Sequence, residues 1–179
     1  MMSTPDFDLH RYMAENPGAV FETVAGEHGV TPRAAVEALP AEMRSLAPGA
    51  AFIDAMGDIA KWGDVTLIVH TEDGIMEFTG PIPEGQVMRG YFNLMGATGF
   101  HGHLRHDRCA GLAFVERPFM NKLSAVIVFF NTDGGVMFKV FVGRDEKREL
   151  KTDQLAAFRA LAKRLCQADA SAIEASAAV

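Results

Sequence analysis

The sequence predicts an α+β protein in which helices at both ends of the chain flank a large antiparallel β-sheet. Apolar residues recur at helical spacing over about 1–50, β-branched and aromatic runs fill about 51–149, and a helical pattern returns over 150–179. Short connections without helices join the β-rich runs, which favours an antiparallel sheet over βαβ units. We expect one domain over residues 1–179, because this length fits a single hydrophobic core.

The N-terminal part carries two short helix patterns. The first follows a turn at residues 16–18 and stops at Gly29. The second has Thr31 as its N-cap and Pro32 in its first turn, and it ends before Pro40. Two short helices around a turn also occur in DNA-binding proteins, but this segment has little positive charge. Packing against the rest of the domain is therefore the favoured interpretation.

The central part begins with an amphipathic helix expected over 51–62 and continues with strands. The turn sequences EDG (72–74) and TDGG (132–135) each predict a hairpin, and the second is the clearer. In chain order the strand candidates are VTLIVH (65–70), IMEFTG (75–80), QVMRGYFNLM (86–95), FHGHLRH (100–106), GLAFVERPF (111–119), SAVIVFFN (124–131) and VMFKVFVG (136–143).

The last part of the chain is expected to be a helix lying on the sheet. Thr152 can serve as its N-cap, and Asp153 suits the first turn of a helix. An apolar stripe at helical spacing then follows, which predicts one face buried against the sheet. The stripe consists of Leu155, Phe158, Leu161 and Leu165.

Composition narrows the class of protein. The formal net charge of −6 opposes binding to nucleic acid, which rewards basic surfaces. The first fifteen residues are polar and of mixed charge, and no apolar run approaches the roughly 18 residues of a membrane span. The cysteines, Cys109 and Cys166, form no CxxC motif. We expect a cytoplasmic protein without membrane insertion or a nucleic-acid partner.

The stretch FHGHLRH holds three of the six histidines. If it forms one strand, His101, His103 and Arg105 share a face, because side chains alternate along a strand. Two histidines could bind one metal ion, but a zinc or iron site needs further ligands. The nearby sequence offers only Asp107. A solvated polar strand face therefore competes with a bare metal site and is favoured over it.

Heme needs fewer protein ligands than a bare metal ion, because its ring supplies four nitrogens. One or two axial side chains, apolar walls and basic partners for the propionates complete such a site. The chain contains 13 Phe and 10 Met, and several arginines lie near the strand candidates. These materials permit heme binding, although any core contains similar ones. His70 ends an apolar strand, which is an unusual place for a polar ring. It is either a candidate heme ligand or a histidine exposed to water at the strand end.

Nucleophilic and nucleotide chemistry find little support. The sequence contains no GxSxG elbow, no GxGxxG loop and no P-loop. Cys109 follows His106 by three residues, but no neighbouring charge indicates a lowered thiol pKa. Glu116 and Arg117 fit a local ion pair better than an acid–base couple. A catalytic site is therefore not indicated by these motifs.

Several segments, read together, resemble the HutX/ChuX family of intracellular heme-utilisation carriers. They are GYFNL, GH followed by an apolar and a basic residue, ERPFM, FFN before a turn, and FVGRD, and the resemblance extends over about 17–154. It implies N-terminal helices, a large antiparallel sheet and a C-terminal helix, in a subunit that looks like half of the HemS/ChuS-type heme proteins. It also implies heme binding, a homodimer, a cytosolic location, and transfer of heme to a heme-degrading enzyme or its safe storage.

The resemblance also implies candidate ligands of the heme iron. Carried over by motif, they are His70 at the end of VTLIVH, Tyr91 of GYFNL and His103 of HGH. His101 is an additional histidine in the same stretch. Arg89 and Arg105 flank these residues, so we assign them as candidate propionate partners, with ordinary surface arginines as the alternative.

The expected function is therefore that of a heme carrier that accepts imported heme for iron acquisition, rather than an enzyme. The alternative is an enzyme on a similar sheet, either a heme-degrading oxygenase or a flavin-dependent split-barrel oxidoreductase. The two classes differ in the fate of bound heme, because a carrier keeps it intact and an oxygenase converts it to a linear tetrapyrrole.

Overall fold

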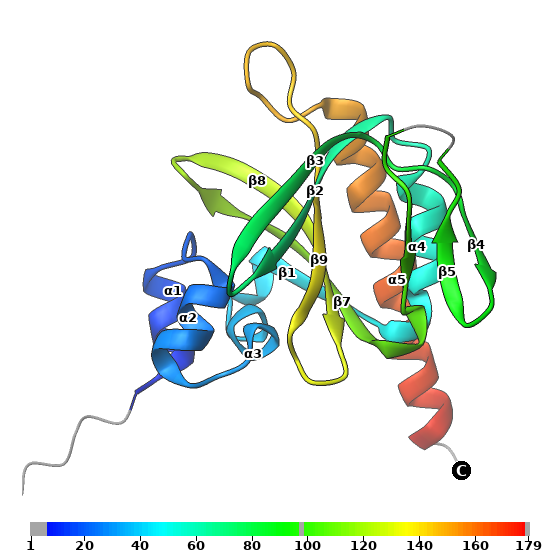
Figure 1. Cartoon of the computed structure of the whole chain (residues 1–179). Helices are drawn as coiled ribbons and strands as arrows, with labels where there is room; N and C mark the ends of the chain where they lie inside the picture. The colour runs from blue at the N-terminus through cyan, green and yellow to red at the C-terminus, as the bar shows by residue number, and fades with distance from the viewer. Residues whose placement is uncertain (1–6, 97–98, 178–179) are drawn as a thin grey trace, which may run out of the picture.

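The computed structural model describes residues 7–96 and 99–177, so the ends of the expected domain, 1–6 and 178–179, lie outside the described residues. Helices at both ends flank a large antiparallel sheet, which confirms the predicted α+β class (Figure 1). The α-helices are α1 (Leu9–Glu15), α2 (Phe21–His28), α3 (Pro32–Glu37), α4 (Phe52–Ile59) and α5 (Thr152–Ala177), with 3-10 turns η1 (Ala41–Met43), η2 (Gly49–Ala51) and η3 (His106–Arg108).

The strands form two antiparallel sheets, of six and three strands. The large sheet has the order β1-β7-β8-β9-β2-β3, and the small sheet has the order β4-β5-β6. The strands are β1 (Arg44–Pro48), β2 (Asp64–Thr71), β3 (Gly74–Pro81), β4 (Gly85–Met88), β5 (Tyr91–Leu94), β6 (Gly102–Leu104), β7 (Cys109–Phe119), β8 (Lys122–Asn131) and β9 (Val136–Phe141).

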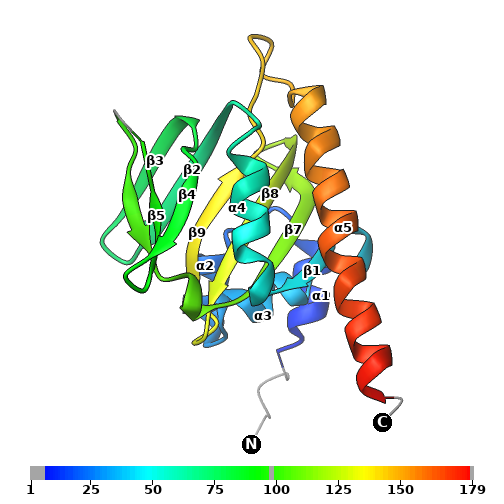
Figure 2. The same ribbon diagram turned by 90° about the vertical axis from the view of Figure 1, so that its right-hand side faces the viewer.

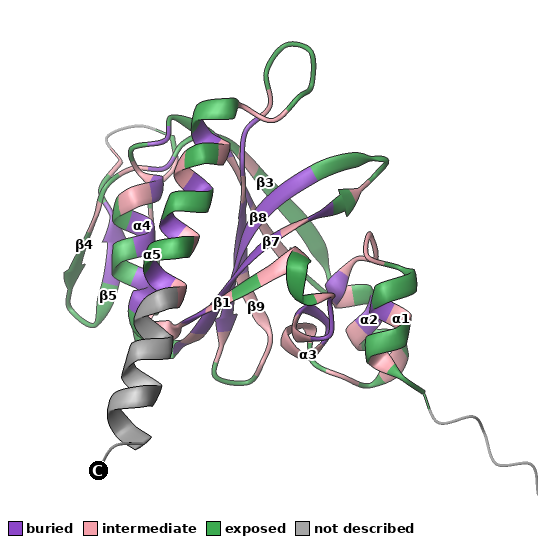
Figure 3. Ribbon diagram, turned by 180° about the vertical axis from the view of Figure 1, so that it is seen from behind, coloured by how far each residue is buried: buried purple, intermediate pink, exposed green. Residues whose placement is uncertain are grey.

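Helices cover both faces of the large sheet. Helices α4 and α5 run across one face, and the three short N-terminal helices pack against part of the other (Figures 1 and 2). The sequence of strand β8 is apolar without alternation because both faces of the strand are buried. Ala125, Ile127 and Phe129 enter the core beneath α4 and α5, whereas the residues between them enter the core beneath α1–α3. Figure 3 shows the buried centre of β7 and β8 in purple.

Arg117 joins the N-terminal helices to the large sheet. Its guanidinium donates hydrogen bonds to the carbonyl oxygens of Pro17 (2.6 Å) and Ala19 (2.7 Å), and it lies 3.8 Å from the ring centroid of Phe21. Burial lowers the pKa of this guanidinium to about 10, and the group remains charged at neutral pH. The expected helix start is also confirmed, because the Thr31 hydroxyl accepts a bond from the Ala34 amide.

Three sequence-based expectations need correction. The N-terminal part is not purely helical, because Arg44–Pro48 forms β1 and pairs with β7 at the edge of the large sheet. The segment 86–95 forms two strands, because Arg89 and Gly90 take positive φ angles of 55° and 81° and reverse the chain. The segment 100–106 forms a strand only over Gly102–Leu104.

That shorter strand changes which side chains share a face. His101 precedes β6, and Arg105 is the residue that leads into the 3-10 turn η3. Strand alternation therefore applies to His103 alone among the three residues expected on one face. Strand alternation therefore does not show whether Arg105 or His101 lies near the other candidate residues. Their individual contacts decide this.

Candidate functional site

Tyr91 and His103 lie on the outer face of the small sheet. Tyr91 opens β5, and the alternate residues Phe92 and Leu94 point the opposite way into the core. His103 pairs in register with Asn93, two residues after Tyr91, so all three belong to one face. The rings of Tyr91 and His103 are 6.0 Å apart between centroids at an interplanar angle of 67°. The strands thus bring together two of the predicted iron ligands.

Asn93 lies between these two residues and is almost buried, with 8% of its surface exposed. Its side-chain oxygen is 2.6 Å from Nδ1 of His103. Its amide nitrogen donates to the backbone carbonyls of Gln86, Met88 and Tyr91. One side chain therefore contacts the histidine ring and also closes the turn that leads to Tyr91.

Arg105 contributes a cation beside Tyr91. Its guanidinium carbon lies 6.0 Å from the Tyr91 ring centroid, and it forms two hydrogen bonds of 2.7 and 2.6 Å to the Asp107 carboxylate. The Arg105 guanidinium holds the pKa of the Asp107 carboxyl at about 2, so both groups are charged at neutral pH. A phenol can bind ferric iron as a hard oxygen ligand, and the Arg105 guanidinium is held beside it.

Among the described residues, Arg89 and His101 make no hydrogen bond, ion pair or ring contact with this cluster. Arg89 lies in the turn between β4 and β5, and His101 lies just before β6; both are exposed. Within residues 7–96 and 99–166, Arg89 makes no hydrogen bond or ion pair. The structure thus leaves both side chains available on the surface next to the strands that carry Tyr91 and His103.

His70 lies in a different place, near the end of β2 in the large sheet. Its Nδ1 is 3.5 Å from a carboxylate oxygen of Glu22 on α2, and the other oxygen of Glu22 is 2.7 Å from Nζ of Lys139. The side chain lines a surface cavity of about 520 Å³ between the N-terminal helices and the sheet. His70 therefore belongs to the large sheet, whereas Tyr91 and His103 belong to the small sheet.

Asn93 and Met88 are neighbours of the candidate ligands that the sequence did not predict. Met88 pairs with Tyr91 across β4 and β5, so its exposed thioether lies on the same face. The spacing of Tyr91 and Asn93 already indicated a shared face, because side chains two apart on a strand point the same way. Met88 lies beside Tyr91 because the chain reverses at Arg89. That reversal was not predicted, because Arg89 was expected inside a single strand.

A second surface feature is the part of the large sheet that the N-terminal helices leave open. It forms a shallow hollow of about 450 Å³, in which Ile68, Phe119, Met120 and Phe141 meet polar and charged side chains. Met120 is 83% exposed at the tip of the β7–β8 hairpin. We call this surface the open face; it is completed by Thr66, Glu77, Thr79, Lys122, Ser124, Val142, Arg144 and Arg148.

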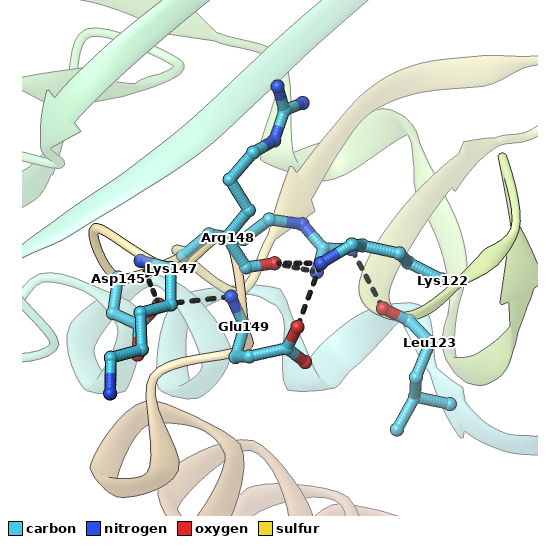
Figure 4. Close-up of polar contacts among 7 residues, drawn as sticks. Lys122, Leu123, Asp145, Lys147, Arg148 and Glu149 are labelled. Atoms are coloured by element: carbon cyan, nitrogen blue, oxygen red, sulfur yellow. Dashed lines mark hydrogen bonds and ion pairs between the residues drawn. The ribbon is translucent and has the colours of Figure 1, made fainter.

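A compact polar network borders the open face (Figure 4). Lys122 donates to the carbonyl of Arg148 and to the Glu149 carboxylate, at 3.3 and 2.8 Å. The Asp145 carboxylate accepts from the amides of Lys147 and Glu149, which closes the loop between β9 and α5. Figure 4 shows the Arg148 side chain extending away from these contacts. The network therefore orders the loop and leaves one arginine head group on the surface.

Two absences hold for the part of the chain that the structure describes. No cluster of three or more His, Cys, Asp or Glu side chains there could hold a metal ion. No helix among those residues combines the length and apolar character needed to cross a membrane.

The donors on the small sheet fit heme better than a bare ion. A phenol, an imidazole and a thioether share one exposed face with a nearby guanidinium, and heme iron needs only one or two of these ligands. Fold and donor set together define an α+β protein with a surface site suited to a flat, iron-bearing ligand.

The chain belongs to the haem utilisation ChuX/HutX family, whose model matches residues 45–161. It is 38% identical over 150 residues to the intracellular heme transport protein HutX of Vibrio cholerae, a match that covers 83% of this chain and 78% of that protein.

Solved structures agree with this membership. A protein from Erwinia carotovora is 46% identical, with a TM-score of 0.85, over 89% of this chain and 99% of the other. The heme-binding protein ChuX is 38% identical, with a TM-score of 0.81, over 88% and 99% of the two chains. The heme-binding protein PhuS of Pseudomonas aeruginosa shares the fold at 19% identity and a TM-score of 0.70, and this chain spans 50% of its length.

Proposed function

We propose that this protein is a cytosolic heme carrier that binds heme on the small sheet and releases it intact to an acceptor. The observation that carries the proposal is the pairing of Tyr91 and His103 on one exposed face beside a fixed guanidinium. The relatives named above support it, since one is called an intracellular heme transport protein and another a heme-binding protein.

The side chains have distinct roles in this proposal. Tyr91 binds ferric iron through its phenolic oxygen, and His103 offers a ring nitrogen as a second ligand. Arg105 is engaged with Asp107, so Arg89 and His101 are the freer candidates for contact with the propionates. His70 remains a separate candidate ligand in the cavity beside α2.

Exposure of the site suits transfer. Tyr91 is 40% exposed, so an acceptor can approach the bound heme without unfolding the carrier. We propose that the physiological acceptor is a heme-degrading enzyme. Mixing the heme-loaded protein with apomyoglobin, a general acceptor, should move the Soret spectrum to that of myoglobin without any loss of total heme.

Hemin titration tests the site. The chain has only two tyrosines, so Tyr12→Phe on α1 is a matched control for Tyr91→Phe. We expect Tyr91→Phe and His103→Gln each to change the Soret spectrum and to weaken ferric hemin binding by about tenfold or more, or about 1.4 kcal/mol. Tyr12→Phe should leave both unchanged. If Tyr91→Phe and His103→Gln both behave like wild type, the site on the small sheet is wrong.

His70→Ala separates the two candidate locations. If the heme lies only on the small sheet, this variant keeps the wild-type spectrum, because His70 belongs to the large sheet beside α2. A loss of the wild-type spectrum in His70→Ala, with Tyr91→Phe unaffected, would move the site to the cavity lined by Glu22 and His70.

The alternative enzymatic functions have simple readouts. Incubation of the heme-loaded protein with an electron donor should leave the Soret band stable, whereas an oxygenase would produce a linear tetrapyrrole. A flavin enzyme would be yellow when purified. The solved heme oxygenase ChuS is 18% identical to this chain, a likeness that concerns the fold alone.

We also propose that two copies pair through the open face. Exposed Met120 gives this surface apolar area, and Arg148 and Glu77 give it both signs of charge, which suits a self-complementary two-fold contact. Sedimentation equilibrium should show a dimer for wild type and a monomer for Met120→Glu. Met95→Glu alters another exposed methionine away from the open face and should remain dimeric. A dimer that persists in Met120→Glu contradicts this assignment.

A further inference from the structure

The Asn93 side chain makes hydrogen bonds through both its nitrogen and its oxygen. The amide nitrogen lies 3.2, 2.9 and 3.0 Å from the carbonyl oxygens of Gln86, Met88 and Tyr91. These three acceptors determine the orientation of the amide, because its oxygen would be repelled by them if the group were turned over. The Asn93 oxygen must therefore face His103.

That orientation determines which nitrogen of His103 carries the proton. The Asn93 oxygen can only accept, and it lies 2.6 Å from Nδ1 of the ring. Nδ1 must then be the donor, so the neutral ring carries its proton there. Nε2 keeps its lone pair and is the nitrogen that can bind iron.

We propose that Asn93 is a positioning residue that holds His103 as the Nδ1–H tautomer and presents Nε2 to heme iron. Histidine ligands of metals are commonly oriented by such a partner on the other ring nitrogen. The same amide donates to the carbonyl of Tyr91, so one side chain orients one candidate ligand and fixes the backbone of the other. This inference rests on the proposed function for its consequence in heme binding, but the tautomer itself belongs to the heme-free protein.

The tautomer can be measured without heme. The heme-free protein, labelled with ¹⁵N at histidine, would be studied by long-range ¹H–¹⁵N correlation NMR at about pH 8, above the ordinary pKa of histidine. The signal of His103 is the one absent from His103→Gln. We expect Nδ1 to show the shift of a protonated nitrogen and Nε2 that of an unprotonated one. The opposite pattern in wild type overturns the proposal.

Two variants separate positioning from a purely structural role. Asn93→Leu removes both the acceptor and the donors at similar volume, whereas Asn93→Asp keeps the acceptor and loses the donors to the turn. We expect Asn93→Leu to abolish the preference of His103 for the Nδ1–H tautomer. It should also weaken hemin binding roughly ten- to a hundred-fold, as substitution of other partners of metal ligands does. Asp should restore the Nδ1–H tautomer and part of the affinity. Equal losses in both variants, with equal tautomer populations, would make Asn93 a turn residue only.

Failure of the carrier function looks different from failure of this inference. If wild type shows the expected tautomer but does not bind hemin, the proposed function is wrong and the role of Asn93 in orienting His103 stands. If wild type binds hemin with the Nε2–H tautomer in its heme-free form, the function stands and the positioning role is wrong. Circular dichroism and thermal unfolding of each variant verify that the compared proteins are folded.

Discussion

The two sheets of this protein differ in what covers them. Helices pack on both faces of the large sheet, so strands such as β8 are apolar on both sides. The small sheet buries one face through Phe92 and Leu94 and leaves the other to Tyr91 and His103. The large sheet therefore provides most of the stability, whereas the small sheet can present polar side chains on its outer face at little cost to folding.

The largest expected effect follows from a truncation in the large sheet. Phe129 is fully buried and packs against Phe52 and Phe138, with centroid separations of 5.5 and 4.3 Å. Phe129→Ala should lower the free energy of unfolding by about 3–5 kcal/mol, because it removes apolar contacts and leaves a cavity. Denaturant unfolding measures this loss, and a change below about 1 kcal/mol would contradict the assigned role of the large sheet.

A somewhat smaller effect is expected where the N-terminal helices meet the large sheet. The Lys139 ammonium is 2.7 Å from Glu22, and both side chains are largely buried. Lys139→Met should destabilise the fold by about 3 kcal/mol, because it leaves the carboxylate without its buried partner. The double variant Glu22→Leu with Lys139→Met should recover much of that loss in the same unfolding assay. Additive losses in the double variant would show that the two groups are not coupled.

The third effect concerns reactivity. Burial raises the pKa of the Cys109 thiol to about 11 at the start of β7. At pH 8 its thiolate fraction, and hence its rate of alkylation by iodoacetamide, should be about a hundredfold below that of the same thiol in the unfolded protein. Mass spectrometry of peptides containing Cys109, with and without denaturant, measures the ratio. Equal labelling in the two states would show that this end of β7 opens readily.

The smallest expected effect on stability comes from the small sheet. Tyr91→Phe should change the free energy of unfolding by less than about 0.5 kcal/mol, because its exposed hydroxyl has no hydrogen bond among the described residues. The same denaturant assay used for Phe129→Ala provides the comparison. A loss above about 2 kcal/mol would mean that the outer face of the small sheet is part of the folding core after all.

The sequence was sufficient for most of the helices and strands, but not for strand β1 or for the turn between β4 and β5. The hairpin through TDGG and the N-cap at Thr31 were predicted because turn and capping residues act locally. Strand β1 was missed because its five residues carry no strong alternation and become a strand by pairing with β7. The turn at Arg89 was missed because an arginine with positive φ has no strong sequence signal.

By itself, the sequence determined the α+β class, the apolar strands, the resemblance to a heme-utilisation family, and the identity of Tyr91, His103 and His70 as candidate ligands. The class and the strands follow from local patterns, and the candidate ligands follow from the family resemblance. Only the tertiary structure separated His70 from the other two, divided the strands into two sheets and placed Asn93 against His103. The physical reason is that strand pairing and side-chain hydrogen bonds join residues distant in the chain, and no local pattern specifies which of them meet.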